Sequence, residues 1–330
     1  SFGYHDQHCG KTTRYFYQKK VWVPTVREIK KANTSATVKS ICCLLGYTPQ
    51  AYHKQTKHLL QKHINDDLVV QQVRRIRTEQ PRCGTRKLLI MLQPFLTLHH
   101  INLGRDYFFD LLAKNKLLVR KTKRSVHTTQ SKHHFRRYPN LIKGFTPLKA
   151  HELWVSDITY IPLKDRFAYL FLITDAYSRK IVGHHVSDDM KVSSAVVALK
   201  KAMAQKPVET IVIHHSDRGV QYCSHEYVNL LEQNHAMISM TQSGDPLENA
   251  VAERVNGILK TELISSSYED IDKASLSIGR AIIIYNFKRR HSSLNYQIPH
   301  QVHLQKGPQI RRWKNYYNAP KSKEKTMQDT

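Results

Sequence analysis

Three acidic side chains, those of Asp157, Asp217 and Glu253, have the local contexts expected of metal-binding carboxylates. Asp157 lies inside the apolar run 153–161, and Asp217 directly follows a second apolar run over 210–216. An ionised carboxylate among buried apolar side chains is unfavourable unless it is paired or binds a cation. Two Mg²⁺ ions about 3.5–4 Å apart, for which Mn²⁺ can substitute, would meet this need and promote phosphoryl transfer. For any one acid alone, a solvated or salt-bridged surface group is an equally good interpretation.

Hydrophobic periodicity predicts the elements that position these acids. The run 210–216 predicts a short buried strand, which puts Asp217 at a strand's carboxyl end, where open α/β sheets place their sites. A helix is predicted from residue 246 onward, with its apolar residues on one side. Four of its other residues fall near one another on the opposite side: Asn249, Glu253, Asn256 and Lys260.

The surrounding pattern predicts an α/β core. It consists of a helix at 193–204 and further strands near 153–161, 168–175, 180–186 and 237–241. The first three strands have hairpin-length connections, so an antiparallel meander is expected. Asp157 would then lie on the first strand beside Asp217 on the fourth, with the helix of Glu253 over them.

Several segments of the chain resemble known DNA-processing enzymes. The segments WVSDITY (154–160), HSDRGVQY (215–222) and NAVAE (249–253) resemble the integrase core of Asp-Asp-Glu transposases, the superfamily that includes retroviral integrases. Between Asp217 and Glu253 lie 35 residues, an interval similar to that of the family. Tyr285-Asn286, the segment RHSSL (290–294) and Pro299 resemble the tail of bacterial insertion-sequence transposases of the IS-three type, encoded by the second reading frame. The similarity covers roughly residues 35–305.

This resemblance implies a fold and an activity. The fold is an RNase H-like mixed-sheet catalytic core preceded by all-α helix-turn-helix DNA-binding modules. The activity is metal-dependent 3′-end nicking and strand transfer of an insertion sequence through a circular intermediate. Asp157, Asp217 and Glu253 would be catalytic and hold the metal ions, and Lys260 would hold a terminal phosphate or base. Supporting roles near the site are expected for His215, Gln221 and Asn249.

Composition independently indicates a nucleic-acid partner. The formal net charge is +26, and the excess of Lys and Arg lies before residue 151 and after residue 274, around a slightly acidic centre. A helix over 37–45, a turn and a helix over 49–57 predict a helix-turn-helix, although an ordinary helical hairpin is nearly as good an interpretation. Its base-contacting candidates are Gln50, Tyr52, His53 and Lys54. Further DNA-contact candidates are Arg82, Arg86 and Lys87 in a loop, Arg120, Lys121, Arg136 and Arg137 in the basic stretch 119–149, and Arg290.

These observations divide the sequence into six expected segments. They are an unassigned extension (1–34), a helix-turn-helix (35–64), a second helix-turn-helix-like region (65–126), a basic linker (127–149), the catalytic core (150–275) and a basic tail (276–330). The first residue is Ser1 rather than methionine, which is typical of a fragment or a processed product.

Other classes of protein fit less well. No apolar run reaches about 18 residues and no secretory signal is present, so a bacterial cytoplasmic, nucleoid-associated protein is expected. The five cysteines form no Cys-x-x-Cys pair, which argues against a structural zinc module. A tyrosine recombinase would find its His-x-x-Arg element at 133–136, but such a match is expected by chance among 20 histidines. A catalytically inactive, repurposed sequence-specific DNA-binding protein remains the main alternative.

The expected partners follow from the resemblance. They are double-stranded DNA, as terminal inverted repeats and as target, and further copies of the chain in a homo-oligomer on DNA. No leucine-zipper heptads occur in the sequence, so the product of an upstream reading frame is a further expected partner or fusion.

Overall fold

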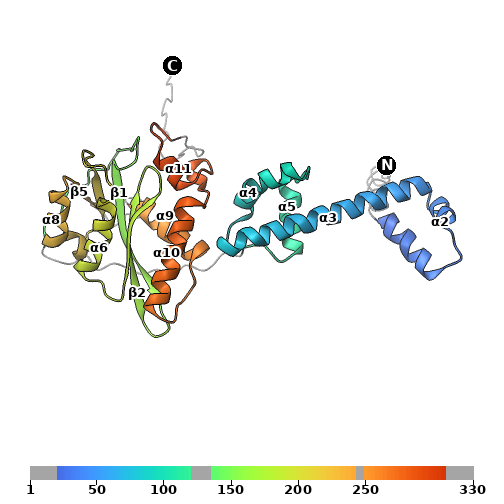
Figure 1. The fold of residues 1–330 in the computed structure, drawn as a ribbon, viewed down its shortest axis with the longest axis horizontal. Coiled ribbons are helices and arrows are strands. Elements are labelled where there is room, and N and C mark those ends of the chain that lie inside the picture. Colours follow the sequence, from blue (N-terminus) through green and yellow to red (C-terminus); the bar gives the residue numbers. More distant parts are fainter. Residues whose placement is uncertain (1–20, 120–134, 243–248, 310–330) are drawn as a thin grey trace, which may run out of the picture. The chain divides into compact units, whose positions relative to one another are not determined.

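The computed structural model describes residues 21–119, 135–242 and 249–309 (Figure 1). The chain forms two compact units. The first comprises residues up to 75 together with 92–117, and the second comprises 76–91 and the residues from 118 onward. None of the described helices combines the length and apolar character needed to cross a membrane.

The first unit is helical. It contains helical residues 21–32, α2 (Val38–Leu44), most of α3 (Pro49–Glu79), the end of α4 (Thr85–Leu98) and α5 (Arg105–Lys114). Trp22, Val23 and Val26 form a buried cluster with Ile41 and Cys42. Residues 21–32 belong to the unassigned extension 1–34, and they supply part of the core around the predicted helix-turn-helix.

α3 is longer than expected. The second helix of the predicted motif was expected to end near residue 57, and a segment boundary was expected at 64/65. Instead α3 continues over 31 residues. The sequence contains no glycine or proline from 51 to 80, so nothing interrupts the backbone hydrogen bonds before Pro81.

The second unit is built on a five-stranded mixed sheet. Its strands are β1 (Leu153–Pro162), β2 (Phe167–Asp175), β3 (Ile181–Ser187), β4 (Ile213–Ser216) and β5 (Met237–Met240). Their order is β3-β2-β1-β4-β5. β1, β2 and β3 form the predicted antiparallel meander, whereas β4 pairs parallel with β1 and with β5. The RNase H-like α/β fold predicted from the sequence is confirmed.

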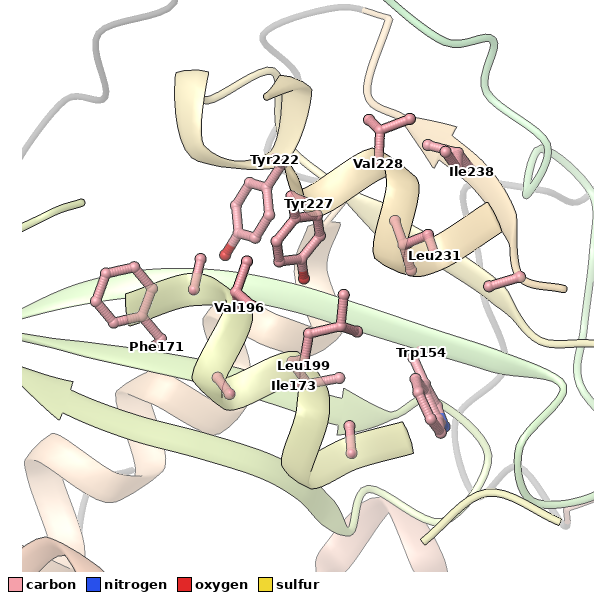
Figure 2. Packing of buried hydrophobic residues seen from close by; sticks show 14 of the residues in the cluster. Trp154, Phe171, Ile173, Val196, Leu199, Tyr222, Tyr227, Val228, Leu231 and Ile238 are labelled. Atoms are coloured by element: carbon pink, nitrogen blue, oxygen red, sulfur yellow. The ribbon is translucent and has the colours of Figure 1, made fainter. Parts of the chain in front are cut away.

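Helices cover both faces of this sheet (Figure 1). Side chains alternate along β2: Phe171 and Ile173 join the cluster of α6 (Val192–Met203) and α8 (His225–Gln233) (Figure 2). Leu170 and Leu172 join the opposite cluster, which belongs to α9 (Ala250–Ile258), the π-helical turn η2 (Leu259–Leu263) and α10 (Ile271–Phe287). This two-residue alternation places apolar side chains on both faces of the central strands.

β3 and α6 pack closely because of one glycine. A Cβ atom at Gly183 of β3 would lie 2.3 Å from the Ala198 carbonyl oxygen and 2.9 Å from the Ala202 side chain. No residue other than glycine fits between β3 and α6 at this separation.

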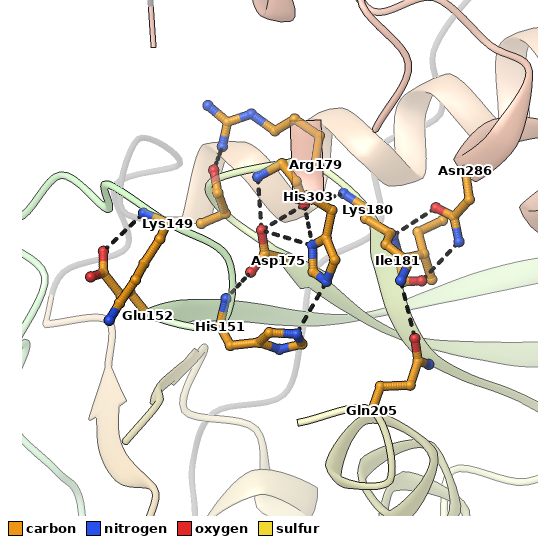
Figure 3. A network of polar contacts seen from close by, with 12 residues as sticks. Lys149, His151, Glu152, Asp175, Arg179, Lys180, Ile181, Gln205, Asn286 and His303 are labelled. Carbon is orange, nitrogen blue, oxygen red and sulfur yellow. Dashed lines mark hydrogen bonds and ion pairs between the residues drawn. The ribbon is translucent and has the colours of Figure 1, made fainter. Parts of the chain in front are cut away.

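Residues 276–309 pack on the core, although the sequence predicted a separate tail from residue 276 onward. α10 crosses the expected boundary at 275/276, and Asn286 exchanges two 2.9 Å hydrogen bonds with the backbone of Ile181. The buried Asp175 carboxylate accepts hydrogen bonds from the His151 and Ser178 amides, each at 2.7 Å (Figure 3). His303 of α11 (Pro299–His303) completes this network, 3.1 Å from the His151 ring between their Nε2 atoms.

The expected basic linker also has a partner in the core where it is described. The Met240 amide donates to the Pro139 carbonyl at 3.2 Å, and the Leu141 amide donates to Ser239 Oγ at 2.9 Å. These bonds hold residues 139–141 along β5.

A buried histidine makes the fold sensitive to acid. His214 of β4 is 1% exposed, and its Nε2 lies 2.7 Å from Ser156 Oγ and 2.9 Å from the Tyr227 hydroxyl. Burial lowers the pKa of His214 to about 3, below its ordinary value of 6.5. Between these values the unfolded chain binds the extra proton, so stability falls as the pH drops below 6.5.

We expect this single group to lower the free energy of unfolding by about 2 kcal/mol between pH 7 and pH 5. Urea denaturation of the wild type and of His214→Gln at both pH values measures the effect. The variant should be less stable at pH 7 but should lose about 2 kcal/mol less on acidification. An identical loss in both proteins would contradict the assignment of a neutral buried imidazole.

Candidate active site

Asp157 and Asp217 lie on neighbouring parallel strands. β1 and β4 pair in parallel up to Val155 opposite His215, and Asp157 and Asp217 each follow this last pair by two residues. β4 ends at Ser216, and Asp217 therefore occupies the carboxyl end of the strand, as predicted. Continuation of the parallel register by two residues would bring Asp157 and Asp217 opposite each other, about 5 Å apart.

α9 is attached to β1 on either side of Glu253. The Asn249 side-chain amide donates to the Ser156 carbonyl at 3.0 Å, and the Asn256 amide donates to Asp157 Oδ2 at 2.6 Å. Residues three apart lie on the same side of a helix, so Glu253 is on the side of α9 that Asn256 turns toward Asp157. The Glu253 side chain is exposed. The beginning of the predicted helix, at 246–248, lies outside the described residues.

The three acids interact electrostatically. The pKa of Asp157 is raised to about 7, mainly by burial and then by the negative charge of Asp217, with a smaller effect from Glu253. Hydrogen bonds from Asn256 and from the Ile158 amide partly oppose the rise. A cation bound near this carboxyl group would compensate the neighbouring negative charges and favour its ionised form.

The loop after β4 fixes Asp217. The Gly219 amide donates to Asp217 Oδ1 at 3.0 Å, and a Cβ atom at position 219 would lie 3.0 Å from that oxygen and 3.2 Å from Gln221 Oε1. Gln221 donates to the Met190 carbonyl at 2.9 Å. His215 Nδ1 lies 2.8 Å from Ser239 Oγ on β5. Gln221 and His215 therefore hold the backbone on either side of Asp217.

Lys260 lies in η2, which follows α9 directly. Burial lowers the pKa of its ammonium group, and the charge of Asp157 raises it. This interaction places the Lys260 ammonium within electrostatic reach of Asp157. Short π-helical turns occur often at functional sites because they displace side chains from the regular helical positions.

Comparison with known proteins identifies the family. The integrase core domain family matches residues 147–246, and a second integrase core domain family matches 234–299. An uncharacterised 31 kDa protein of insertion element IS600 from Shigella sonnei is 32% identical over 260 residues, which are 77% of this chain and 94% of that protein. The chain belongs to the family of bacterial insertion-sequence transposases.

Other relatives of this transposase-family chain agree. The transposase of IS629 from Shigella sonnei is 28% identical over 78% of this chain and 88% of its own length. The transposase of IS904 from Lactococcus lactis is 37% identical over 49% of this chain and 65% of its own length. Among solved structures, the HTLV-2 integrase catalytic core domain in complex with magnesium has 19% identity and a TM-score of 0.38, covering 48% of this chain and 99% of that one. The family models and the sequence relatives show that the chain is an insertion-sequence transposase of polynucleotidyl transferase type, with an integrase core.

The transposase core contains oxygen donors suited to a divalent cation. Within the described residues, no group of three or more His, Cys, Asp or Glu side chains is close enough together to enclose an ion. However, the Oδ1 atoms of Asn249 and Asn256 are buried and accept no hydrogen bond from any described residue. Carboxylate and amide oxygens are the ligands that Mg²⁺ prefers, so the donor set around Asp157 fits such an ion.

Asn256 was missed as a functional residue. The sequence places it on the polar side of the helix with Glu253, and that position was the available signal. Its partner, Asp157, is 99 residues distant in the chain, and only the folded structure reveals the bond between them.

Two of the predicted DNA-contact side chains form contacts inside the second unit instead. Lys87 Nζ lies 2.6 Å from Glu262 Oε2, and Arg82 donates to the Thr261 carbonyl at 3.3 Å. Lys87 lies within α4 rather than in the expected loop, because the helix begins at Thr85. Arg86, in the same turn, is exposed. The predicted DNA contacts of Arg82 and Lys87 would require these bonds to break.

The other predicted DNA-contact residues have varied surroundings. Tyr52 is half-buried, with its ring 6.1 Å from that of Trp22, and so contributes to packing in the first unit. Arg290 donates to the Tyr296 carbonyl at 3.1 Å. Arg120 and Lys121 lie outside the described residues. The exposed candidates are Gln50, His53, Lys54, Arg136 and Arg137.

Proposed function

We propose that the chain nicks DNA at the 3′ ends of an insertion sequence and transfers the freed strands, through a circular intermediate. One observation carries the proposal: the pKa of Asp157 responds to both Asp217 and Glu253, while Asn249 and Asn256 attach the helix of Glu253 to β1. Three carboxylates that repel one another at the end of a sheet are typical of a site that needs cations.

In this proposal Asp157, Asp217 and Glu253 hold two Mg²⁺ ions, for which Mn²⁺ can substitute. Such ions, when bound, supply Lewis-acid stabilisation of charge on phosphoryl oxygens. Asn256 orients Asp157 through Oδ2. Lys260, beside Asp157, would contact the phosphate or base at the DNA end.

DNA affinity would come from elsewhere on the chain. Exposed polar and basic residues at the start of α3, namely Gln50, His53 and Lys54, would contact the terminal inverted repeats, and Arg86, Arg136, Arg137 and Arg290 would contact phosphates. Phosphate contacts position the duplex without reading its sequence. The active form would be a homo-oligomer on DNA, with the upstream-frame product as a further partner.

A DNA cleavage assay tests this function. The full chain is incubated with duplex DNA carrying the ends of its element and with Mg²⁺, with and without the upstream-frame product, and the strands are separated on a denaturing gel. We expect 3′-end nicks and joined ends that disappear when the divalent ion is chelated. DNA binding without any cleavage in Mg²⁺ or Mn²⁺ would instead favour the inactive, repurposed DNA-binding protein.

A further inference from the structure

We propose that Glu262 is a positioning residue that fixes the π-helical turn η2 and thereby sets the position of Lys260, which is within electrostatic reach of Asp157. This inference rests on the proposed function, in which Lys260 contacts the DNA end. Glu262 itself faces two cations rather than the three acids, so it acts through Lys260 and not on the DNA.

The Glu262 carboxylate joins three segments of the second unit. It accepts hydrogen bonds from Arg289 Nε at 2.9 Å and from Arg289 Nη2 at 3.0 Å, and from Lys87 Nζ at 2.6 Å. The side chains are 22%, 5% and 14% exposed for Glu262, Arg289 and Lys87, so this network is poorly screened by water. A two-pronged arginine contact fixes both the position and the plane of a carboxylate.

The backbone of η2 is held at the same place. The Arg82 amide donates to the Glu262 carbonyl at 3.4 Å, and Arg82 Nη1 donates to the carbonyls of Thr261 at 3.3 Å and Lys260 at 3.5 Å. Thr261 Oγ1 also donates to the Gly257 carbonyl at 2.6 Å. Carbonyls at the end of a helix lack partners within the helix, and here the Arg82 guanidinium supplies donors to two of them.

These bonds hold three consecutive residues of η2, of which Lys260 is the first. A π-helical turn is less stable than an α-helical one and persists where surrounding contacts favour it. Without the negative charge of Glu262, the positive charges of Lys87 and Arg289 would repel each other with no carboxylate between them. Both side chains contact η2 through residue 262, so their separation would disturb this turn. The expected result is a turn that no longer holds Lys260 beside Asp157.

A double-mutant cycle tests this role. Glu262→Gln, Lys260→Ala and the double variant are compared with the wild type in the nicking assay at saturating DNA. We expect Glu262→Gln to lower kcat about 10-fold with little change in KM, Lys260→Ala to lower it by roughly 10²-fold, and the double variant to match Lys260→Ala alone. If the role of Glu262 were purely structural, Glu262→Gln would lower thermal stability, and the kcat of the double variant would fall by the product of the two single losses.

The chain offers a matched control. Lys288 and Glu79 form a 2.6 Å ion pair that also joins the end of α3 to α10, but both side chains are about half exposed. An exposed pair contributes little to stability. Lys288→Ala should therefore leave nicking unchanged, and Glu262→Asp provides a second variant should Glu262→Gln fail to fold.

A measurement without DNA separates this inference from the proposed function. Acetylation of lysines in the full chain, quantified by mass spectrometry, should be several-fold faster at Lys260 in Glu262→Gln than in the wild type, and unaffected by Lys288→Ala. Unchanged acetylation of Lys260, or multiplied losses in the cycle, would overturn the positioning role. A wild type that binds DNA but never nicks it would overturn the proposed function, while the acetylation result would still decide the role of Glu262.

Discussion

Asp217→Asn is expected to reduce DNA nicking by roughly 10³-fold or more while DNA affinity stays unchanged. The substitution keeps the shape of the side chain and leaves an oxygen that can accept the 3.0 Å bond from the Gly219 amide. What it removes is the negative charge beside Asp157, on which cation binding depends. The exposed DNA-contact candidates at the start of α3 are in the other unit of the chain and keep their charges.

Nicking of end-bearing duplex and a mobility-shift titration, performed on the same preparation, measure the two quantities. Glu226→Gln is a suitable control, since Glu226 is an exposed acid in the first turn of α8 and changes the net charge by the same amount. Nicking by Asp217→Asn at the wild-type rate would refute the role of this carboxylate. Equal loss of binding and nicking would point to a defect in folding.

Local patterns in the sequence were sufficient to predict the strands, whose apolar side chains recur at a regular spacing. The alternation of apolar residues predicted the meander of β1, β2 and β3, and the apolar run before Asp217 predicted β4. Because both acids lie beside buried strand residues, their proximity followed once the strands were paired. The resemblance to transposases supplied Glu253.

The contacts between distant segments could not be predicted in this way. Glu262 forms its ion pair with Lys87 across 175 residues, and no local pattern relates the two. The same holds for Asn256 and Asp157, and for Asn286 and Ile181. In each case a polar side chain forms a hydrogen bond or an ion pair with a residue of another element. Such pairs depend on how the elements pack in three dimensions, and hydrophobic periodicity does not predict them.

The helical part illustrates a different difficulty. α3 contains no glycine, and no proline after Pro49, yet the sequence predicted a boundary at 64/65 because polar residues there obscure the helical period. Before α2, Trp22, Val26 and Ile29 have helical spacing, and this spacing could have predicted the helix over 21–32. Packing of this helix against Ile41 and Cys42 explains why its apolar residues are there.

Asp157→Asn should make the metal-free protein more stable at pH 8, by about 4 kcal/mol, and should abolish nicking. The unfolded carboxyl group loses its proton near its ordinary pKa of 3.8, whereas in the folded protein the pKa is about 7. The folded state therefore binds more protons within this window, and stability falls as the pH rises through it. The asparagine side chain does not titrate, so the stability of the variant does not fall in this way as the pH rises.

In the presence of Mg²⁺ at pH 8, the wild type should become more stable than Asp157→Asn. A cation bound at the acids removes the repulsion that Asp217 and Glu253 exert on Asp157, so it should raise the melting temperature of the wild type at pH 8 and not that of the variant. Calorimetric scans of both proteins at pH 5 and pH 8, with Mg²⁺ or with chelator, give the melting temperature under each condition. A wild type that gains no stability from Mg²⁺ at pH 8, or a variant that gains as much, would contradict cation binding at Asp157. Because the comparison needs no DNA, it tests the electrostatic basis of the site separately from its chemistry.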